Sequence, residues 1–282
     1  MKNNWLHDHS ANIYSQFGED GIINKILSML PETNSVCIDI GAHDGITCSN
    51  TRNIIFNEDY VAILIECNKK RFEELTSNYK NNQNVHCINE QLGFNESNLD
   101  LLLNKYDLNV PVDFDFLSID IDGNDYHIWG KINNYQPKLV CCEFNPSIPN
   151  QVDFVQEENM DVNHGCSILS LNKLAQRKGY ELIAMTQNNA FFIDRKYFND
   201  FNIVDNSIEQ IRDDYSSITY IFQGYDGKIF LRGYGKFIWH GFIKIRERKL
   251  QDLPRIFRIY LDKMGPFMNR LFYWYKNLRK KV

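Results

Sequence analysis

The sequence has no continuous run of eighteen apolar residues, so we expect no single-helix membrane span. Residues 1–10 are polar and lack an apolar signal core, which predicts a cytoplasmic protein. The seven cysteines are scattered and form no CxxC pair, which argues against a zinc ribbon and for a reducing compartment. With 282 residues, of which 43% are hydrophobic, the chain is long and apolar enough for a folded domain and is not disordered throughout.

Acidic residues are scarce at the C-terminal end. Residues 236–282 contain 13 Lys and Arg but only 3 Asp and Glu, whereas residues 1–235 contain 18 and 33. We therefore expect an acidic domain over residues 1–235 and a basic, amphipathic helical tail over residues 236–282. An acidic domain repels a phosphate backbone, so we expect no nucleic-acid partner.

Short apolar runs alternate with helix-like stretches along the first region. We expect strands at 35–40, 61–66, 85–89, 114–121 and 139–144, and helices at 19–30, 68–79, 99–106 and 167–178. This alternation predicts a mainly parallel sheet flanked by helices. Residues 180–186 and 190–194 are two further strands whose short connection forces an antiparallel hairpin. The expected fold class is α/β, the Rossmann-like class I methyltransferase fold, with a C-terminal helical tail.

The turn after the first expected strand lacks both the G-x-G-x-x-G fingerprint of a dinucleotide site and the lysine of a P-loop. It carries Asp39, Gly41 and Gly45, which would let the backbone approach a ligand and let a carboxylate meet a cationic amine. Glu66 ends the second strand, about twenty residues further on, where a carboxylate can accept hydrogen bonds from both ribose hydroxyls. The alternatives are a turn with no ligand and a surface glutamate that caps the next helix.

Three short blocks resemble one family of enzymes. They are residues 15–21 (SQFGEDG), 39–45 (DIGAHDG) and 120–126 (DIDGNDY). Together they resemble the FkbM-like methyltransferases, especially a branch often found with glycan-assembly genes, over roughly residues 14–198. The resemblance implies a class I fold, S-adenosylmethionine as methyl donor, and O-methylation of a sugar or similar hydroxyl. Matched by position, Asp39 and Gly41 would line the methionine end of the cofactor, with His43 beside them, and Glu66 would meet the ribose.

Acidic side chains follow the fourth and fifth expected strands. Asp120 and Asp122 end one strand, and Glu143 and Asn145 end the next. In a parallel sheet both ends meet the same cleft, so Asp120 would lie near the methyl donor, and Asp120 and Asp122 are candidate catalytic residues that could take the acceptor's proton. Asp120, Asp122, Glu143 and Asn145 also supply the oxygen ligands that Mg²⁺ or Mn²⁺ prefers. The alternative is a turn that caps the next helix, with Asp125 as its N-cap.

Other polar side chains are candidates for the same cleft. His164 lies in a loop that could close over the acceptor, and we rank it ahead of His127 as the proton acceptor. Gln16 and Asp20 could fold over the cofactor mouth. The alternatives are a packed or solvated histidine and, for Gln16 and Asp20, a role in capping the helix that follows.

The basic tail has apolar and aromatic residues at three- and four-residue steps from Leu253 to Leu278, with basic residues in much of the rest. Gly265-Pro266 should kink or split such a helix. An apolar face beside a basic face is typical of a helix that lies in the plane of a membrane, which predicts an anionic membrane surface as partner. The same steps suit packing on the domain itself or on a second copy, so a homo-oligomer stays open.

These patterns favour an S-adenosylmethionine-dependent methyltransferase acting on a sugar hydroxyl of a glycan or lipid-linked saccharide at the cytoplasmic membrane face. One rival is a metal-dependent glycosyltransferase, because Asp120-Ile121-Asp122 is also a DxD pattern. Another rival is a non-catalytic, methyltransferase-like scaffold whose tail tethers a complex.

Overall fold

The computed structural model describes residues 2–57 and 59–280, and the chain divides into two compact units, with the boundary in the sequence between Tyr215 and Ser216. The expected boundary after Gly235 lies inside the second unit. Among the described residues, no helix is both long and apolar enough to cross a membrane.

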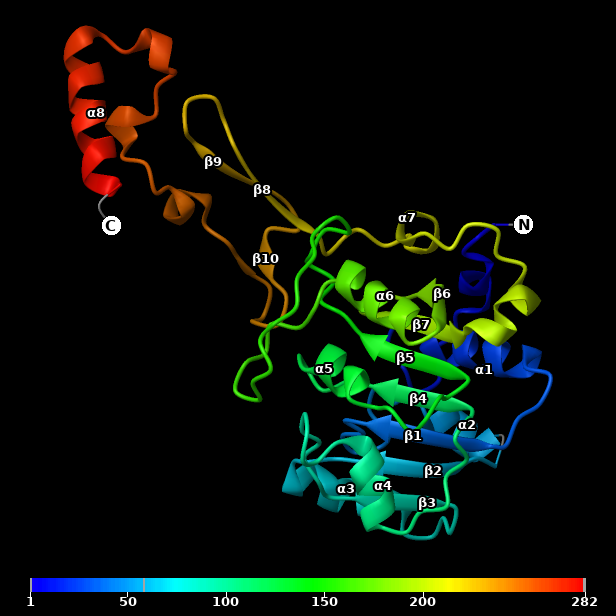
Figure 1. The fold of residues 1–282 in the computed structure, drawn as a ribbon. Coiled ribbons are helices and arrows are strands. Elements are labelled where there is room, and N and C mark those ends of the chain that lie inside the picture. Colours follow the sequence, from blue (N-terminus) through cyan, green and yellow to red (C-terminus); the bar gives the residue numbers. More distant parts are fainter. Residues whose placement is uncertain (1, 58, 281–282) are drawn as a thin grey trace. The chain divides into compact units, whose positions relative to one another are not determined.

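A single sheet of seven strands organises the first unit (Figure 1). The strands are β1 (Val36–Ile40), β2 (Val61–Ile65), β3 (Val85–Ile88), β4 (Phe116–Ile119), β5 (Leu139–Glu143), β6 (Tyr180–Met185) and β7 (Asn189–Asp194). Their order is β3-β2-β1-β4-β5-β7-β6, and β7 runs antiparallel to both of its neighbours. The predicted parallel sheet with one closing hairpin, the class I methyltransferase fold, is therefore confirmed.

The helices α1 (Glu19–Met29), α2 (Arg52–Asn57), α3 (Lys69–Tyr79), α4 (Leu99–Lys105), α5 (Asp125–Gly130), α6 (Ile168–Arg177) and α7 (Ile208–Ile211) flank this sheet (Figure 1). Asn68 caps α3, since its side chain accepts hydrogen bonds from the backbone N–H groups of Lys70 and Arg71. Ser167 caps α6 in the same way. The N-cap of α5 is Asn124 and not Asp125, which corrects the prediction by one residue.

The central strands are buried on both faces, as expected for a sheet covered by helices. In β4, for example, Phe116 and Leu117 are consecutive, so their side chains point to opposite faces, and neither has any exposed surface. One charged pair is also buried here: Lys138 Nζ lies 2.6 Å from Asp115, whose carboxylate further accepts hydrogen bonds from two backbone N–H groups and from the Tyr60 hydroxyl. The carboxylate is therefore fully partnered, which is what makes a buried charge tolerable.

The second unit is built from short elements. β8 (Thr219–Gln223) pairs with β9 (Ile229–Gly233), and β10 (Lys236–Phe237) pairs with β11 (Ile243–Lys244), both antiparallel. Single 3₁₀ turns follow at Glu247–Leu250, Arg255–Phe257 and Leu261–Lys263 before α8 (Pro266–Arg279).

The predicted C-terminal helix and its predicted interruption at Gly265-Pro266 are confirmed, but the tail before that point is not α-helical. The α-helix begins only at Pro266, and the apolar steps before it fall on 3₁₀ turns. Pro254 and Pro266 both disfavour helical backbone in the residue that precedes them. The stretch between them is shorter than the ~12–15 residues that an isolated helix needs, so it stays irregular.

Candidate functional site

The turn after β1 brings the backbone of two strands into contact. Gly41 has a φ of +91°, and a Cβ atom there would lie 1.9 Å from the carbonyl oxygen of Asp120. Only glycine fits this position, because a side chain would force β1 and β4 apart. The ends of these two strands are thus held together at the carboxyl edge of the sheet, where α/β folds bind ligands.

Asp39 is a buried carboxylate at this edge. Its Oδ2 accepts a hydrogen bond of 2.7 Å from the Thr51 hydroxyl. Burial raises the pKa of Asp39 to about 6; hydrogen bonds from Thr51 and Ser118 oppose that rise, and the nearby Glu66 carboxylate adds to it. The ionised Asp39 carboxylate is therefore destabilised by desolvation, and a cation bound beside it would stabilise it.

Glu66 is buried as well, directly after β2. Its two carboxylate oxygens accept hydrogen bonds from the backbone N–H groups of His43, at 2.9 Å, and Asn68, at 2.6 Å. Glu66 thereby ties the turn after β1 to the start of α3. Glu66 is buried and is therefore not a surface glutamate, but its bond from the Asn68 N–H does place a carboxylate at the N-terminus of α3, as the capping alternative expected.

Both carboxylates line one cavity of about 360 Å³. This volume lies within the range of small-molecule sites, roughly 300–1,000 Å³. The cavity also contains Gln16, Gly41, His43, Asp120 and Asp122, so the structure brings together most of the predicted cofactor residues. The remaining lining residues are Ala42, Thr47, Cys48, Ser49, Asn50, Cys67, Arg71, Ser118 and Ile121.

Gly45 lies outside the cavity lining and has a packing role instead. A Cβ atom at Gly45 would lie 2.5 Å from side-chain atoms of Leu75 and Tyr79 in α3, and its carbonyl oxygen accepts a hydrogen bond from the Tyr79 hydroxyl. With a φ of +71°, it allows the turn to close tightly against the helix. Glycine is therefore needed at position 45 of the turn because α3 packs directly against it.

The N-terminal loop that carries Gln16 is fixed by two buried acidic residues. The Asp20 carboxylate accepts hydrogen bonds from the backbone N–H groups of Ile13, Tyr14 and Ser15, at 2.7–2.8 Å. Glu19 accepts from the Phe17 N–H on one oxygen and from Thr186 and Asn189 on the other. Asp20 thus supports the loop from within, and Gln16 alone reaches the cavity, where it contacts Cys48.

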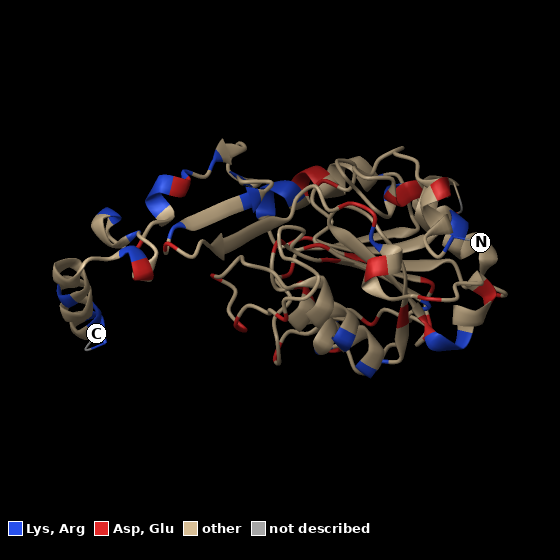
Figure 2. Cartoon of the chain, turned by 90° about the horizontal axis from the view of Figure 1, so that it is seen from above, with Lys and Arg blue, Asp and Glu red and all other residues tan. Residues whose placement is uncertain are grey.

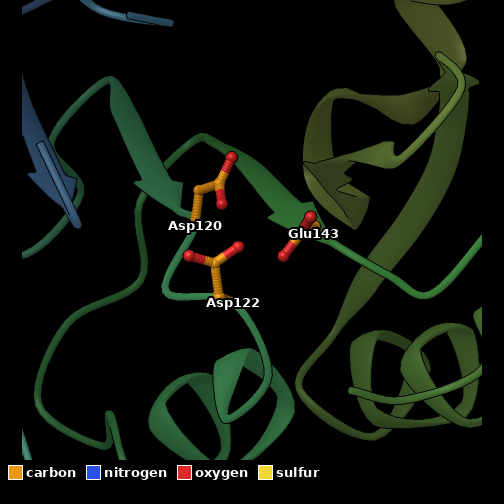
Figure 3. A group of neighbouring side chains, drawn as sticks. All are labelled: Asp120, Asp122 and Glu143. Carbon is orange, nitrogen blue, oxygen red and sulfur yellow. The ribbon is translucent and has the colours of Figure 1, made fainter. Parts of the chain in front are cut away.

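Three carboxylates converge at the ends of β4 and β5. One carboxylate oxygen from each of Asp120, Asp122 and Glu143 lies within 4.8 Å of the other two, and Figure 3 shows the three side chains beside one another. Burial raises the pKa of Asp120 to about 8, with further increases from Asp125, Asp122, Asp39 and Glu19. Burial also raises the pKa of Glu143 well above its usual range, and Asp120 adds to that effect. Because the three carboxylates repel one another when ionised, the cluster is stabilised by protonation of its members or by a bound cation.

A hydrogen bond joins Asn145 to the loop that carries His164. The Asn145 amide donates to the His164 carbonyl oxygen at 2.9 Å, and its own oxygen accepts from Ser147. His164 is exposed and does not line the cavity, and its backbone N–H donates to Gln156. The ring of His127 contacts the Gln156 carbonyl oxygen at 2.7 Å. Gln156 therefore organises this loop beside the acidic cluster.

Sequence reasoning missed part of the lining. Residues 47–50 and Arg71 carried no recognisable motif, yet all of them line the cavity. Arg71 follows Asn68 at the start of α3, where the first turn of the helix meets the ligand edge of the sheet. The sequence did offer one signal for Arg71: it is a basic residue in the first turn of the helix that follows the strand-end carboxylate Glu66.

Comparisons with known proteins give fold-level likenesses only. No family model matches the chain, and no curated protein matches it. Among solved structures, the N-terminal domain of EvdMO1 with SAH bound has 8% sequence identity and a TM-score of 0.41, covering 62% of this chain and 79% of that one. A putative caffeoyl-CoA O-methyltransferase from Staphylococcus aureus has 15% identity and a TM-score of 0.39, covering 61% and 82%. A SAM dependent methyltransferase from Aquifex aeolicus has 9% identity and a TM-score of 0.36, covering 68% and 97%.

Proposed function

We propose that the protein is an S-adenosylmethionine-dependent methyltransferase that methylates a hydroxyl group of a sugar. The observation that carries this proposal is the convergence of two buried carboxylates, Asp39 and Glu66, on one cavity at the carboxyl ends of β1 and β2. A cavity lined by carboxylates attracts a cation and repels a free phosphate.

The lining fits the chemical groups of this cofactor. S-adenosylmethionine supplies a methyl group on a sulfonium cation. Asp39 is placed to accept hydrogen bonds from the ammonium group, and Glu66 from the ribose hydroxyls, since each carboxylate oxygen has a further lone pair beyond its present partner. Arg71 is the one Lys or Arg in the lining that the structure describes, and it would pair with the carboxylate of the same ligand.

Asp120 is the best-placed group to accept the proton of the sugar hydroxyl. It lines the cavity, whereas His164 does not. Its pKa of about 8 is close to neutral pH, where a general base combines a useful ionised fraction with affinity for a proton. Asp122 lies beside it and raises that pKa, so we assign Asp122 a tuning role.

The same cluster also supports a divalent cation as an additional component. Asp120, Asp122 and Glu143 offer the oxygen ligands that Mg²⁺ or Mn²⁺ prefers, and such an ion would lower the pKa of the acceptor hydroxyl. Asn145 is less available for this role, because both ends of its amide are engaged within the loop. A chelator decides the question: full turnover after metal stripping removes the ion from the mechanism.

Isothermal titration calorimetry with S-adenosylmethionine tests the proposal. We expect binding that Asp39→Ala and Glu66→Ala each weaken by tenfold or more, while Glu74→Gln, an exposed change on α3, leaves it unchanged. Asp120→Asn should lower turnover more than cofactor affinity. If only a nucleotide sugar binds, the protein is a glycosyltransferase that uses Asp120 and Asp122. If neither ligand binds, the scaffold alternative is correct.

A further inference from the structure

The second unit leaves large apolar side chains exposed. Among its described residues, the buried apolar side chains are Ile218, Phe257 and Met264. Exposed ones occur on most of its elements and in its loops, among them Phe222, Trp239, Phe242, Phe267 and Trp274. Single exposed apolar residues are normal on a protein surface, but a concentration of aromatic ones marks a surface that something else covers.

α8 has two different apolar sides. One side packs within the unit, where the rings of Phe272 and Tyr275 lie 5.6 Å and 5.1 Å from the ring of buried Phe257. Phe267, Trp274 and Leu278 are separated by seven and four residues, which places them together on another side of the helix. Their exposed fractions are 76%, 60% and 48%. We call these three residues the α8 stripe.

The charge of the unit indicates the chemistry of the covering surface. Residues 216–282 contain 15 Lys and Arg and 4 Asp and Glu, and Figure 2 shows the basic residues along this part of the chain. Arg270 lies three residues after Phe267 and four before Trp274, which puts a cation next to the α8 stripe. Aromatic residues with flanking cations are typical of segments at the membrane–water interface, where the apolar part enters the lipid and the charges meet headgroups.

We propose that the second unit docks on an anionic lipid surface, with the α8 stripe inserted at the level of the headgroups. Charge decides against a second copy of this unit as the occupant, because two strongly basic surfaces repel each other. The first unit is acidic, but its exposed apolar side chains, such as Val112 and Val204, are not concentrated on one element. This docking is independent of methyl transfer, and it can fail while the proposed function holds.

Co-sedimentation of the full-length protein with vesicles tests the proposal. We expect binding to vesicles of phosphatidylcholine with phosphatidylglycerol, little binding to phosphatidylcholine alone, and weaker binding at ~1 M salt, where charges are screened. The triple variant Phe267→Ser, Trp274→Ser, Leu278→Ser should lower the partition coefficient at least about a hundredfold. Val204→Ser, a change at a residue that is 93% exposed in the first unit, should leave it unchanged.

A conservative variant separates insertion from loss of folding. Tryptophan emission should shift to shorter wavelength when anionic vesicles are added. Trp274→Phe should remove most of that shift and keep the binding, whereas Trp239→Phe should keep the shift. The proposal is overturned if the wild type ignores anionic vesicles, or if the triple variant binds them equally well. A dimer that the triple variant loses, without vesicle binding, would assign the stripe to a second copy.

Discussion

The two units of this chain differ in how far they bury their apolar side chains. The first buries its apolar residues within a seven-stranded sheet and its helices, and places its unusual polar groups at one edge of that sheet. The second has two short hairpins, single 3₁₀ turns and one helix, and most of its large apolar side chains are exposed. The contrast teaches that composition alone does not reveal a core, because both units are rich in apolar residues.

The charge of the two units differs in the same sense. The first unit buries carboxylates, and the loss of hydration destabilises their ionised form, as the raised pKa values of Asp39 and Asp120 show. The second keeps its cations at the surface, where they remain hydrated. Buried charge that the fold does not need is a sign of a ligand, and exposed charge of one sign beside apolar residues is a sign of a surface partner.

Cutting the chain after Tyr215 gives the largest expected effect. Residues 1–215 should unfold cooperatively and keep their ligand affinity, because their core and cavity are complete without the second unit. Residues 216–282 should show no cooperative thermal transition by circular dichroism, since so little apolar surface is buried there. A sharp transition in the second fragment would contradict the comparison.

Acidic residues in the two units should differ in their importance for stability. Asp115→Ala leaves the Lys138 ammonium buried without its partner, and we expect a loss of about 3–5 kcal/mol in the free energy of unfolding. Glu247→Ala removes the partner of Arg232 and of the Leu231 N–H at the surface of the second unit, and the denaturation midpoint should stay unchanged. Chemical denaturation measures both. Equal effects would show that the second unit is packed as firmly as the first.

The elements of the first unit could be predicted from the sequence, for a physical reason. Buried parallel strands such as β2 (Val61–Ile65) are short apolar runs, and a carboxylate within or directly after such a strand is visible in the sequence. Asp39 and Glu66 were identified in this way, and the structure puts them in one cavity. α2 was missed, because a six-residue helix has too few turns to show a period.

What could not be predicted depends on contacts between distant residues. Gly45 looks like a ligand glycine in the sequence, but its conformation serves Tyr79, thirty-four residues away. Gln156 determines where His164 lies, and no local pattern reveals that. In the tail, the interruption at Gly265-Pro266 was predicted, but the 3₁₀ turns between Pro254 and Pro266, where periodicity predicted a helix, were not.

Asp39→Asn should separate function from stability in the first unit. The pKa of Asp39 is raised to about 6, so the folded state holds this proton more tightly than the unfolded chain does. Stability should therefore fall as pH rises from about 4 to about 6, and stay lower above that. The variant lacks this penalty, and we expect a higher melting temperature than wild type at about pH 8, with at least tenfold weaker binding of S-adenosylmethionine. A less stable variant would mean that the carboxylate contributes more to folding than it costs.

The smallest effect is expected from Thr51→Val, which tests the same carboxylate through its hydrogen bond. Losing the 2.7 Å bond from the Thr51 hydroxyl should raise the pKa of Asp39 further, because that bond stabilises the ionised form. Cofactor binding requires the ionised form, so affinity should fall as the pH is lowered through the pKa of Asp39. In the wild type this fall should be centred at about pH 6, and in the variant it should occur at a higher pH. Thr47→Val is the matched control, since Thr47 lines the same cavity but donates to Asp44. Calorimetry across this pH range measures the shift. A profile that is identical in Thr51→Val and wild type would show that Asp39 does not govern cofactor affinity, and that the acidic edge of the first unit is not used as a cation site.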